Sequence, residues 1–207
     1  MESYIVKILC VAVLGYLLGS VNSSLIVGRF YGIDVRNYGS GNAGTTNTLR
    51  TMGKTAALLV VVGDLLKGVI ACLAGMYIIG DVPGIGNLGG MIGGTTAIFG
   101  HNWPLYFGFK GGKGALTSLA VAFLMDWRIG LILLAIFLVI VAVTRYVSLG
   151  SICGGLSFPV LSALPVFNKN LPFIIFAVVL AVSLVLMHRS NIGRILKGTE
   201  SKFSIKK

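Results

Sequence analysis

The stretch IGLILLAIFLVIVAVTRYV (129–147) decides the fold class. A helix that spans a membrane needs about 20 mostly apolar residues, and this stretch meets that need with a single charge, Arg145, near its end. Six more apolar stretches flank it, so the sequence predicts seven transmembrane helices. The other predicted spans are 5–27, 55–80, 88–107, Ala115–Met125, 151–166 and Leu171–Met187. Of these, Ala115–Met125 is short for a complete crossing.

The composition agrees with a polytopic membrane protein. Of the 207 residues, 56% are apolar and only 11% are charged, whereas ordinary globular domains carry about 25% charged residues. We therefore expect an all-α integral membrane protein, with one transmembrane domain over residues 1–207 and a short basic tail from about residue 188. The three cysteines lie in apolar segments without a C-x-x-C pair, which favours inert core residues over a metal or redox site.

Basic residues are distributed unequally between the predicted loops. With the N-terminus outside, thirteen lie on the cytoplasmic side and two, Arg128 and Lys169, in the outer loops. Cytoplasmic loops of membrane proteins carry an excess of Lys and Arg, so this orientation is predicted, with the C-terminus in the cytoplasm. Topology explains the net charge of +11 without a nucleic-acid partner. The thirteen residues are Arg29, Arg36, Arg50, Lys54, Lys110, Lys113, Arg145, Arg189, Arg194, Lys197, Lys202, Lys206 and Lys207.

A glycine-rich motif, NYGSGNAGTTN (37–47), follows the first predicted span and fits the pattern G-x-G-x-x-G. A dinucleotide-binding fold needs a strand before the motif and an acidic residue about 20 positions after it. Here a membrane span precedes the motif, and the acid at that distance, Asp64, lies inside the next span. Nicotinamide and flavin binding are therefore excluded. The stretches MGKTAALL (52–59) and GFKGGKG (108–114) also fail the spacing of a nucleotide-binding P-loop.

The glycine-rich motif keeps the chemistry of an anion site. Glycines at positive φ let successive backbone N–H groups form a nest around an anion, although a solvated loop of turn-forming residues has the same composition. GFKGGKG adds two lysines, and HRSNIGRILKGTE (188–200) adds two arginines and an asparagine. Three such motifs on one predicted membrane face favour a phosphorylated ligand at the cytoplasmic interface.

GSGNAGTTN, GHNWP…GFKGGKG and HRSNIGRILKGTE resemble the three cytoplasmic motifs of the bacterial acyl-phosphate:glycerol-3-phosphate acyltransferases. The resemblance extends from GSVNSS (19–24) to Glu200. It implies a protein of the bacterial cytoplasmic (inner) membrane that moves a fatty acyl group from long-chain acyl phosphate to the 1-hydroxyl of glycerol 3-phosphate. The products would be lysophosphatidic acid and phosphate, and neither acyl-CoA nor acyl carrier protein would be the direct donor.

The residues agree with this reaction. Other glycerolipid acyltransferases use an H-x-x-x-x-D pair, which neither His101 nor His188 forms. Acyl phosphate is already an activated anhydride, so the protein mainly has to position the reactants and stabilise charge, while the acyl chain stays in the membrane lipid. No metal cluster is expected, and no cofactor. A transporter of phosphorylated solutes is the alternative, although its typical inverted repeats are not seen.

Roles for individual residues follow as hypotheses. Phosphate binding is expected of the glycines, amides, hydroxyls and basic groups of the three motifs, although the basic groups also serve as topology signals. These residues are Arg36, Gly39, Gly41, Asn42, Gly44, Thr46, Asn47, Lys110, Gly111, Gly112, Lys113, Arg189 and Arg194. Catalytic contributions are expected of Ser40, Ser148, Ser151, His188 and Asn191.

Three of these catalytic candidates leave alternatives open. Ser148 and Ser151 would donate to the acyl oxygen that becomes anionic, or they are simply serines at a turn or helix cap. His188 would accept the hydroxyl proton, or a substrate phosphate does so and His188 binds and orients. If the last span continues as one helix, His188 and Asn191 share a face because they are three residues apart.

Four polar residues in or near the spans complete the candidates as a possible pocket lining: Ser23, Asp64, Lys67 and His101. A charge at the centre of a membrane helix costs about 2.5–3.5 kcal/mol on insertion scales. Asp64 and Lys67 are spaced i, i+3 and are expected to pair, either as a structural ion pair or as part of the site. His101 precedes Pro104, which ends or kinks a helix, and is a structural or a functional histidine.

Overall fold

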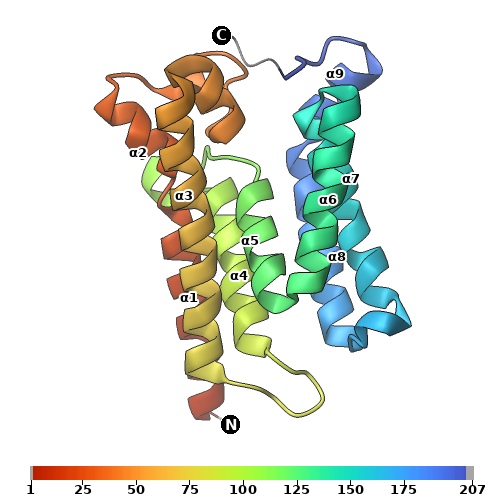
Figure 1. Cartoon of the computed structure of the whole chain (residues 1–207). Coiled ribbons are helices and arrows are strands. Elements are labelled where there is room, and N and C mark those ends of the chain that lie inside the picture. Colours follow the sequence, from red (N-terminus) through yellow and green to blue (C-terminus); the bar gives the residue numbers. More distant parts are fainter. Residues whose placement is uncertain (1, 204–207) are drawn as a thin grey trace. The chain divides into compact units, whose positions relative to one another are not determined.

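The computed structural model describes residues 2–203, and the described residues form helices joined by loops, without a strand (Figure 1). They divide into two compact units, Met1–Met125 and Asp126–Lys207. The single domain expected from the sequence stays a prediction. Lys206 and Lys207, which were counted in the basic tail, lie outside the described residues.

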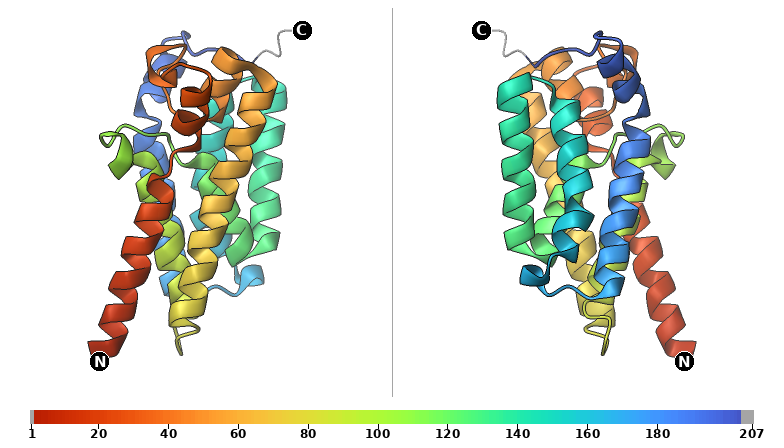
Figure 2. Two further views of the ribbon diagram at one scale, coloured as in Figure 1. Left: turned by 90° about the vertical axis from the view of Figure 1, so that its left-hand side faces the viewer. Right: turned by 90° about the vertical axis from the view of Figure 1, so that its right-hand side faces the viewer.

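Unit 1 contains five α-helices and two short 3₁₀ turns among its described residues. Their order is α1 (Glu2–Ser20), α2 (Ser23–Phe30), η1 (Val35–Asn37), α3 (Thr45–Ile79), α4 (Leu88–Asn102), η2 (Leu105–Phe107) and α5 (Ala115–Met125). Helix α4 packs against both α1 and α3, and α3 also packs against α5. Figure 2 shows α2 and the start of α3 gathered at the end of the unit opposite the N-terminus. The polar motifs of unit 1 lie at that end.

Close helix packing in unit 1 depends on glycine. A Cβ atom on Gly75 of α3 would overlap the backbone carbonyl of Gly89 in α4, and one on Gly19 of α1 would overlap the carbonyl of Ala97. Membrane helices lack a hydrophobic drive to associate, so small residues that let the backbones approach are favoured at their interfaces. The structure therefore gives these glycines a packing role.

The first predicted span, 5–27, is wrong as a continuous helix. Helix α1 ends at Ser20, and α2 begins at Ser23 after a break at Val21 and Asn22. The side chain of Asn22 causes the new start, because its Oδ1 accepts a hydrogen bond from the N–H of Leu25 at 3.0 Å and so satisfies an end group of α2.

Two other boundaries differ from the predicted spans. Helix α3 begins ten residues before the predicted 55–80, at Thr45, and is kinked at Gly53, whose φ is 86°. A φ of this sign is easily adopted by glycine. The predicted span 88–107 ends early, with α4 stopping at Asn102, because Pro104 cannot continue the helix. The short span Ala115–Met125 is confirmed as a helix end to end.

Unit 2 packs α6 (Trp127–Thr144), α7 (Val147–Ala163) and α8 (Leu171–Met187), followed by α9 (Arg189–Leu196), with a 3₁₀ turn, η3 (Pro165–Phe167), between α7 and α8. At one end, Asp126 accepts from the backbone N–H of Arg128 at 2.9 Å and forms ion pairs with Arg128 and Lys169 at 2.9 and 2.8 Å. Phe158, Phe173 and Phe176 pack edge to face with ring centroids 5.7–6.0 Å apart.

The ends of two predicted spans change in unit 2. The span 129–147 stops at Thr144, because Arg145 adopts the left-handed conformation with φ 62°, and the next helix starts at Val147 rather than at Ser151. The last span does not continue through its motif, since α8 and α9 form an angle of 58° at His188. The condition under which His188 and Asn191 would share a face, a last span that continues as one helix, is therefore not met.

The number of membrane crossings stays a prediction. Among the described residues, three helical segments are long and apolar enough to cross a membrane: Ser3–Phe30, Thr45–Ile79 and Trp127–Thr144. The bent pair of α8 and α9 makes a fourth if it is one span, and α5 and α7 are shorter apolar helices. Seven spans and the sidedness of the termini are predicted from hydropathy and charge alone.

Candidate active site

The glycine loop, residues 38–44, is held in shape by Asn47. Gly39 and Gly41 have φ of 59° and 70°, which confirms the expected positive φ at both. Oδ1 of Asn47 accepts from the backbone N–H of Ser40 at 2.9 Å. Its Nδ2 donates to the carbonyls of Val35 and Tyr38, both at 2.9 Å. Because Asn47 is buried and its amide serves three backbone groups, the structure gives it a bracing role.

The glycine loop leads directly into the N-terminus of α3. Gly44 is the N-cap residue and provides no side-chain cap, so the first N–H groups of the helix are not satisfied by such a cap. The positive end of the helix dipole and these N–H groups favour an anion. Within the described part of the chain, Oγ1 of Thr45 is also buried without a hydrogen-bond partner. Ser40 is exposed, and Asn42 and Thr46 are half-buried.

Arg36 joins the glycine loop to the second glycine-rich loop, residues 108–114. Its Nε and Nη2 donate to the carboxylate of Asp34 at 2.7–3.1 Å, and its Nη1 donates to the carbonyls of Phe107 at 2.9 Å and Lys110 at 3.3 Å. The hydrogen bond from Arg36 lowers the pKa of Asp34 despite partial burial. The guanidinium predicted to grip phosphate is thus also a tether between the loops.

The second loop is docked on the end of α4 through its backbone. The N–H of Gly111 donates to the carbonyl of Asn102 at 3.2 Å, and the N–H of Gly112 donates to that of His101 at 3.1 Å. A Cβ on either glycine would overlap groups of α4, which explains why glycine is required at both positions. Lys110 is exposed, and Lys113 is half-buried.

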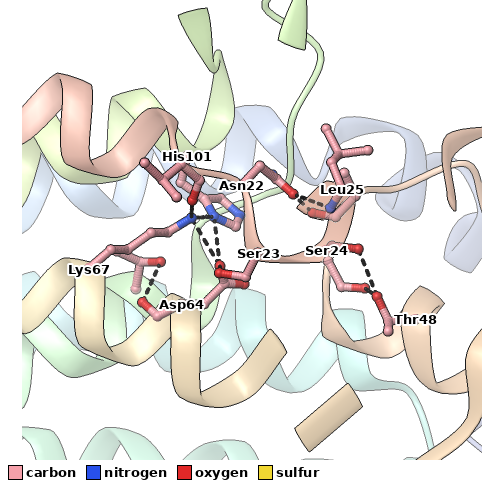
Figure 3. A network of polar contacts seen from close by, with 12 residues as sticks. Asn22, Ser23, Ser24, Leu25, Thr48, Asp64, Lys67 and His101 are labelled. Carbon is pink, nitrogen blue, oxygen red and sulfur yellow. Dashed lines mark hydrogen bonds and ion pairs between the residues drawn. The ribbon is translucent and has the colours of Figure 1, made fainter. Parts of the chain in front are cut away.

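Below these loops lies a buried polar network drawn from three helices, α2, α3 and α4 (Figure 3). Asp64 and Lys67 of α3 pair at 2.9 Å with their side chains 3% and 6% exposed, which confirms the predicted pairing. His101 of α4 approaches both, its Nδ1 lying 2.7 Å from Nζ of Lys67. Ser23 of α2 donates to Asp64 Oδ1 at 3.0 Å. The four residues predicted as a pocket lining are therefore brought together.

In unit 2, the third motif folds around a residue that the sequence did not single out. Glu200 accepts hydrogen bonds from Ser148 Oγ at 2.7 Å, Asn191 Nδ2 at 2.6 Å and Arg194 Nε at 2.7 Å. Burial alone would raise the pKa of Glu200, but these three hydrogen bonds outweigh it and lower the pKa. In the sequence, the only signal that could have pointed to Glu200 was its position as a lone acidic residue in a basic tail.

The remaining candidates of unit 2 are placed less centrally. Nδ1 of His188 lies 2.8 Å from the carbonyl of Leu184. Since a carbonyl only accepts, Nδ1 carries the proton, and the neutral ring has its lone pair on Nε2. Ser151 donates to the carbonyl of Val147 at 3.0 Å, and Arg189 is exposed. Of the predicted set in this unit, Ser148, Asn191 and Arg194 meet at Glu200.

Comparison with known proteins identifies the family. Residues 9–198 match the model of a family described as glycerol-3-phosphate acyltransferase. A glycerol-3-phosphate acyltransferase of Thermoanaerobacter sp. (strain X514) is 46% identical over 94% of this chain and 95% of its own. One of Clostridioides difficile (strain 630) is 43% identical over 99% of this chain and 98% of its own.

Solved structures show the same fold. The crystal structure of PlsY (YgiH), an integral membrane glycerol 3-phosphate acyltransferase, in its glycerol 3-phosphate form matches with a TM-score of 0.87 and 35% identity, over 95% of this chain and 96% of that one. Its lysophosphatidic acid form matches with a TM-score of 0.84 and 34% identity, over 95% of both chains. The protein is thus an integral membrane acyltransferase, and it belongs to the glycerol-3-phosphate acyltransferase family.

Proposed function

We propose that this protein transfers a fatty acyl group from acyl phosphate to the 1-hydroxyl of glycerol 3-phosphate. The observation that carries the proposal is the likeness to a structure described as the glycerol 3-phosphate form of an acyltransferase, across 95% of the chain. The loops of unit 1 suit a phosphorylated substrate. They combine a helix N-terminus that lacks a side-chain cap with Arg36 and the lysines of the second loop.

The acyl-phosphate donor is inferred from the resemblance of the three polar motifs to those of the acyl-phosphate:glycerol-3-phosphate acyltransferases. In acyl phosphate, the bond from the acyl carbon to the phosphate oxygen is already weak. The hydroxyl oxygen of glycerol 3-phosphate forms the new ester bond to that carbon, and phosphate leaves with the electron pair. The hydroxyl proton passes to a base, and the negative charge that develops on the acyl oxygen needs hydrogen-bond donors.

His188 suits the role of that base. Its Nδ1–H donates to the carbonyl of Leu184 at 2.8 Å, so its Nε2 is the basic atom, and the carbonyl fixes the orientation of the ring. General-base catalysis contributes about 10²–10⁴-fold in rate. A phosphate oxygen of a substrate as the base, with His188 only orienting, is the other possibility that the sequence left open, and a pH–rate profile separates the two.

The other candidates take roles set by their contacts. We propose that Ser40, Asn42 and Thr46 contact the phosphate of glycerol 3-phosphate together with the lysines of the second loop, while Asn47 and Arg36 shape the loops. In unit 2, the hydrogen bonds to Glu200 would hold the side chains of Ser148 and Asn191 in place for the reaction. The positions of the phosphate and the acyl group within this arrangement are part of the proposal.

We further propose that the protein lies in the bacterial inner membrane with its N-terminus outside and its polar motifs facing the cytoplasm. The unequal distribution of Lys and Arg between the predicted loops supports this orientation. Cysteine-accessibility labelling tests it. A single cysteine at Lys202 is expected to react from the cytoplasmic side, and a cysteine at Lys169 from the outside.

The decisive assay mixes the purified protein in detergent with radiolabelled glycerol 3-phosphate and palmitoyl phosphate. Lysophosphatidic acid is expected with palmitoyl phosphate and not with palmitoyl-CoA or palmitoyl-acyl carrier protein. Product from the latter two alone would overturn the proposed donor. No product at all, together with uptake of glycerol 3-phosphate into vesicles, would favour the transporter alternative.

Two serines of the same helix provide a matched pair for this assay. Ser148 Oγ donates to Glu200, whereas Ser157 Oγ donates only along α7 to the carbonyl of Cys153 at 2.8 Å. Ser148→Ala is expected to lower kcat, and Ser157→Ala is expected to behave as the wild type. Equal effects of the two substitutions would refute a role for Ser148 in the reaction.

A further inference from the structure

The buried network of unit 1 determines which nitrogen of His101 carries a proton. Nζ of Lys67 has three acceptors within reach: Asp64 Oδ1 at 2.9 Å, His101 Nδ1 at 2.7 Å and the carbonyl of Val21 at 3.2 Å. An ammonium group has three protons and no lone pair, so it donates to all three. His101 Nδ1 is consequently an acceptor, and the proton of the neutral ring lies on Nε2.

The break in the first span explains why a lysine is needed at this depth. Val21 lies just after the end of α1, and its carbonyl accepts from Lys67. A polar backbone group inside a membrane protein costs several kcal/mol if it stays unsatisfied. Lys67 satisfies it, and Asp64 balances the charge of Lys67. The pair therefore stabilises the break, and the break in turn places Asn22, whose Nδ2 donates to the carbonyl of Ala43 at 3.4 Å.

The outer nitrogen of His101 lies where the two glycine-rich loops meet. A Cβ on Gly112 would overlap His101 Nε2 and would lie 2.7 Å from the carbonyl of Ala43. Ala43 belongs to the first loop and Gly112 to the second. Ala43 and His101 are both buried. The Nε2 atom of this buried ring therefore lies beside the backbone of the second loop and near that of the first.

We propose that the Lys67–Asp64 pair and His101 act as positioning residues, fixing the Nε2–H form of His101 and so setting the spacing of the two glycine-rich loops for a phosphate ligand. The proposal rests on the proposed function for the identity of that ligand, glycerol 3-phosphate. It assigns a purpose to charges that are costly inside a membrane and that lie beneath the loops.

The first experiment reads the proton directly by NMR of the full-length protein in detergent, with ¹⁵N-labelled histidine. The signals of His101 are identified by their absence from His101→Gln. In the wild type, Nε2 is expected to be protonated and Nδ1 not. Asp64→Asn combined with Lys67→Met removes both charges without leaving one buried alone. This double variant lacks the donor to Nδ1, so the proton is expected to move to Nδ1, facing the new amide oxygen.

The control for this experiment is Thr117→Val. Thr117 Oγ1 donates to the backbone carbonyl of Asp64 at 3.2 Å, and not to a side chain of the network. This substitution is expected to leave the proton on Nε2 and the KM for glycerol 3-phosphate unchanged. Protonated Nδ1 in the wild type, or the same ring form in the wild type and in the double variant, would overturn the proposal.

The second experiment connects the network to the loops through kinetics. Misplacing binding groups by about 1 Å can lower activity about 10²-fold, so the double variant is expected to lose about that factor in kcat/KM, mainly through a higher KM for glycerol 3-phosphate. A KM equal to that of the wild type, despite a changed ring form, would overturn the positioning role.

Substitutions of His101 keep the test decisive if the double variant does not fold. The amide nitrogen of Gln reaches the place of Nε2, whereas the Asn amide reaches only the place of Nδ1. His101→Gln is therefore expected to retain more activity than His101→Asn, and the reverse order would contradict the proposal. A wild type that forms no lysophosphatidic acid would refute the proposed function instead, and the NMR spectra would still confirm or overturn the proton position.

Discussion

Replacing Asn47 by Ala removes the brace of the glycine loop, and its cost follows from the contacts. The substitution deletes three hydrogen bonds, each of 2.9 Å, between the buried amide and backbone groups of Val35, Tyr38 and Ser40. A hydrogen bond in a protein contributes about 1 kcal/mol net, and a buried group left unsatisfied costs about 1–3 kcal/mol. We therefore expect the free energy of unfolding to fall by about 3 kcal/mol.

Denaturant titration of the detergent-solubilised protein measures this loss, with the KM for glycerol 3-phosphate as a second reading. Asn42→Ala is the matched control, because Asn42 is the same residue type in the same loop and is only half-buried. Surface substitutions away from special features usually change stability by less than about 0.5 kcal/mol. Asn42→Ala is thus expected to raise KM while leaving stability nearly unchanged.

Asn47→Asp sharpens the test, because it keeps the size of the side chain. The carboxylate still accepts from the N–H of Ser40, but it presents an oxygen instead of an N–H group to two carbonyls. The loss is expected to equal or exceed that of Asn47→Ala. A change below about 0.5 kcal/mol for either variant would show that the brace is not needed, and the reasoning would fail.

Three further predictions follow from other contacts. The pKa of Glu200 is lowered in the folded protein, so its ionised form stabilises the fold at pH values above the unfolded pKa of about 4.3. This stabilisation is lost as the pH falls through the pKa of Glu200 in the folded protein. The difference in unfolding free energy between wild type and Glu200→Gln should therefore shrink as the pH falls below the unfolded pKa of about 4.3, and a constant difference would contradict this. Gly75→Ala is expected to cost about 1–3 kcal/mol by overpacking against Gly89, whereas Gly193→Ala, with open space around it, should be neutral in the same denaturation experiment. Equal free energies of unfolding for the two variants would refute the packing argument. Arg36→Lys keeps the charge but cannot hold a carboxylate and two carbonyls together. The KM for glycerol 3-phosphate should therefore rise about tenfold, a change equivalent to about 1.4 kcal/mol. An unchanged KM would contradict the role of Arg36 as a tether between the loops.

Hydropathy predicts the helices of this protein well wherever they are uninterrupted. Ala115–Met125 and Leu171–Met187 match α5 and α8 at both ends. The break near Asn22 and the extension of α3 through the kink at Gly53 were missed, and continuation past Met187 was left open, because an apolar run does not record the local backbone conformation. A side-chain cap starts one helix, a positive φ kinks another, and a bend of 58° separates the last two.

The candidate site could be predicted in part for a related reason. Spacing within one helix predicted the pair of Asp64 and Lys67, since residues three or four positions apart are neighbours on a helix face. Contacts between distant segments leave no such spacing. His101 joins that pair from 34 residues away, and Ser148 meets Glu200 from 52 residues away. Motifs thus indicate which residues matter, but only the structure separates the residues that hold the loops in shape from those that remain candidates to bind substrate.

The shortness of α5 has a consequence for where the chemistry takes place. Its 11 residues rise about 16 Å, roughly half of a hydrocarbon layer of about 30 Å. Its first turn contacts α3 midway along that helix, where Thr117 meets Asp64. The loop before α5 therefore lies close to the buried pair of Asp64 and Lys67. In the proposed reaction, the phosphate-binding groups of this loop would be lowered toward the acyl chains, and a lipid tail would react without first being lifted into water.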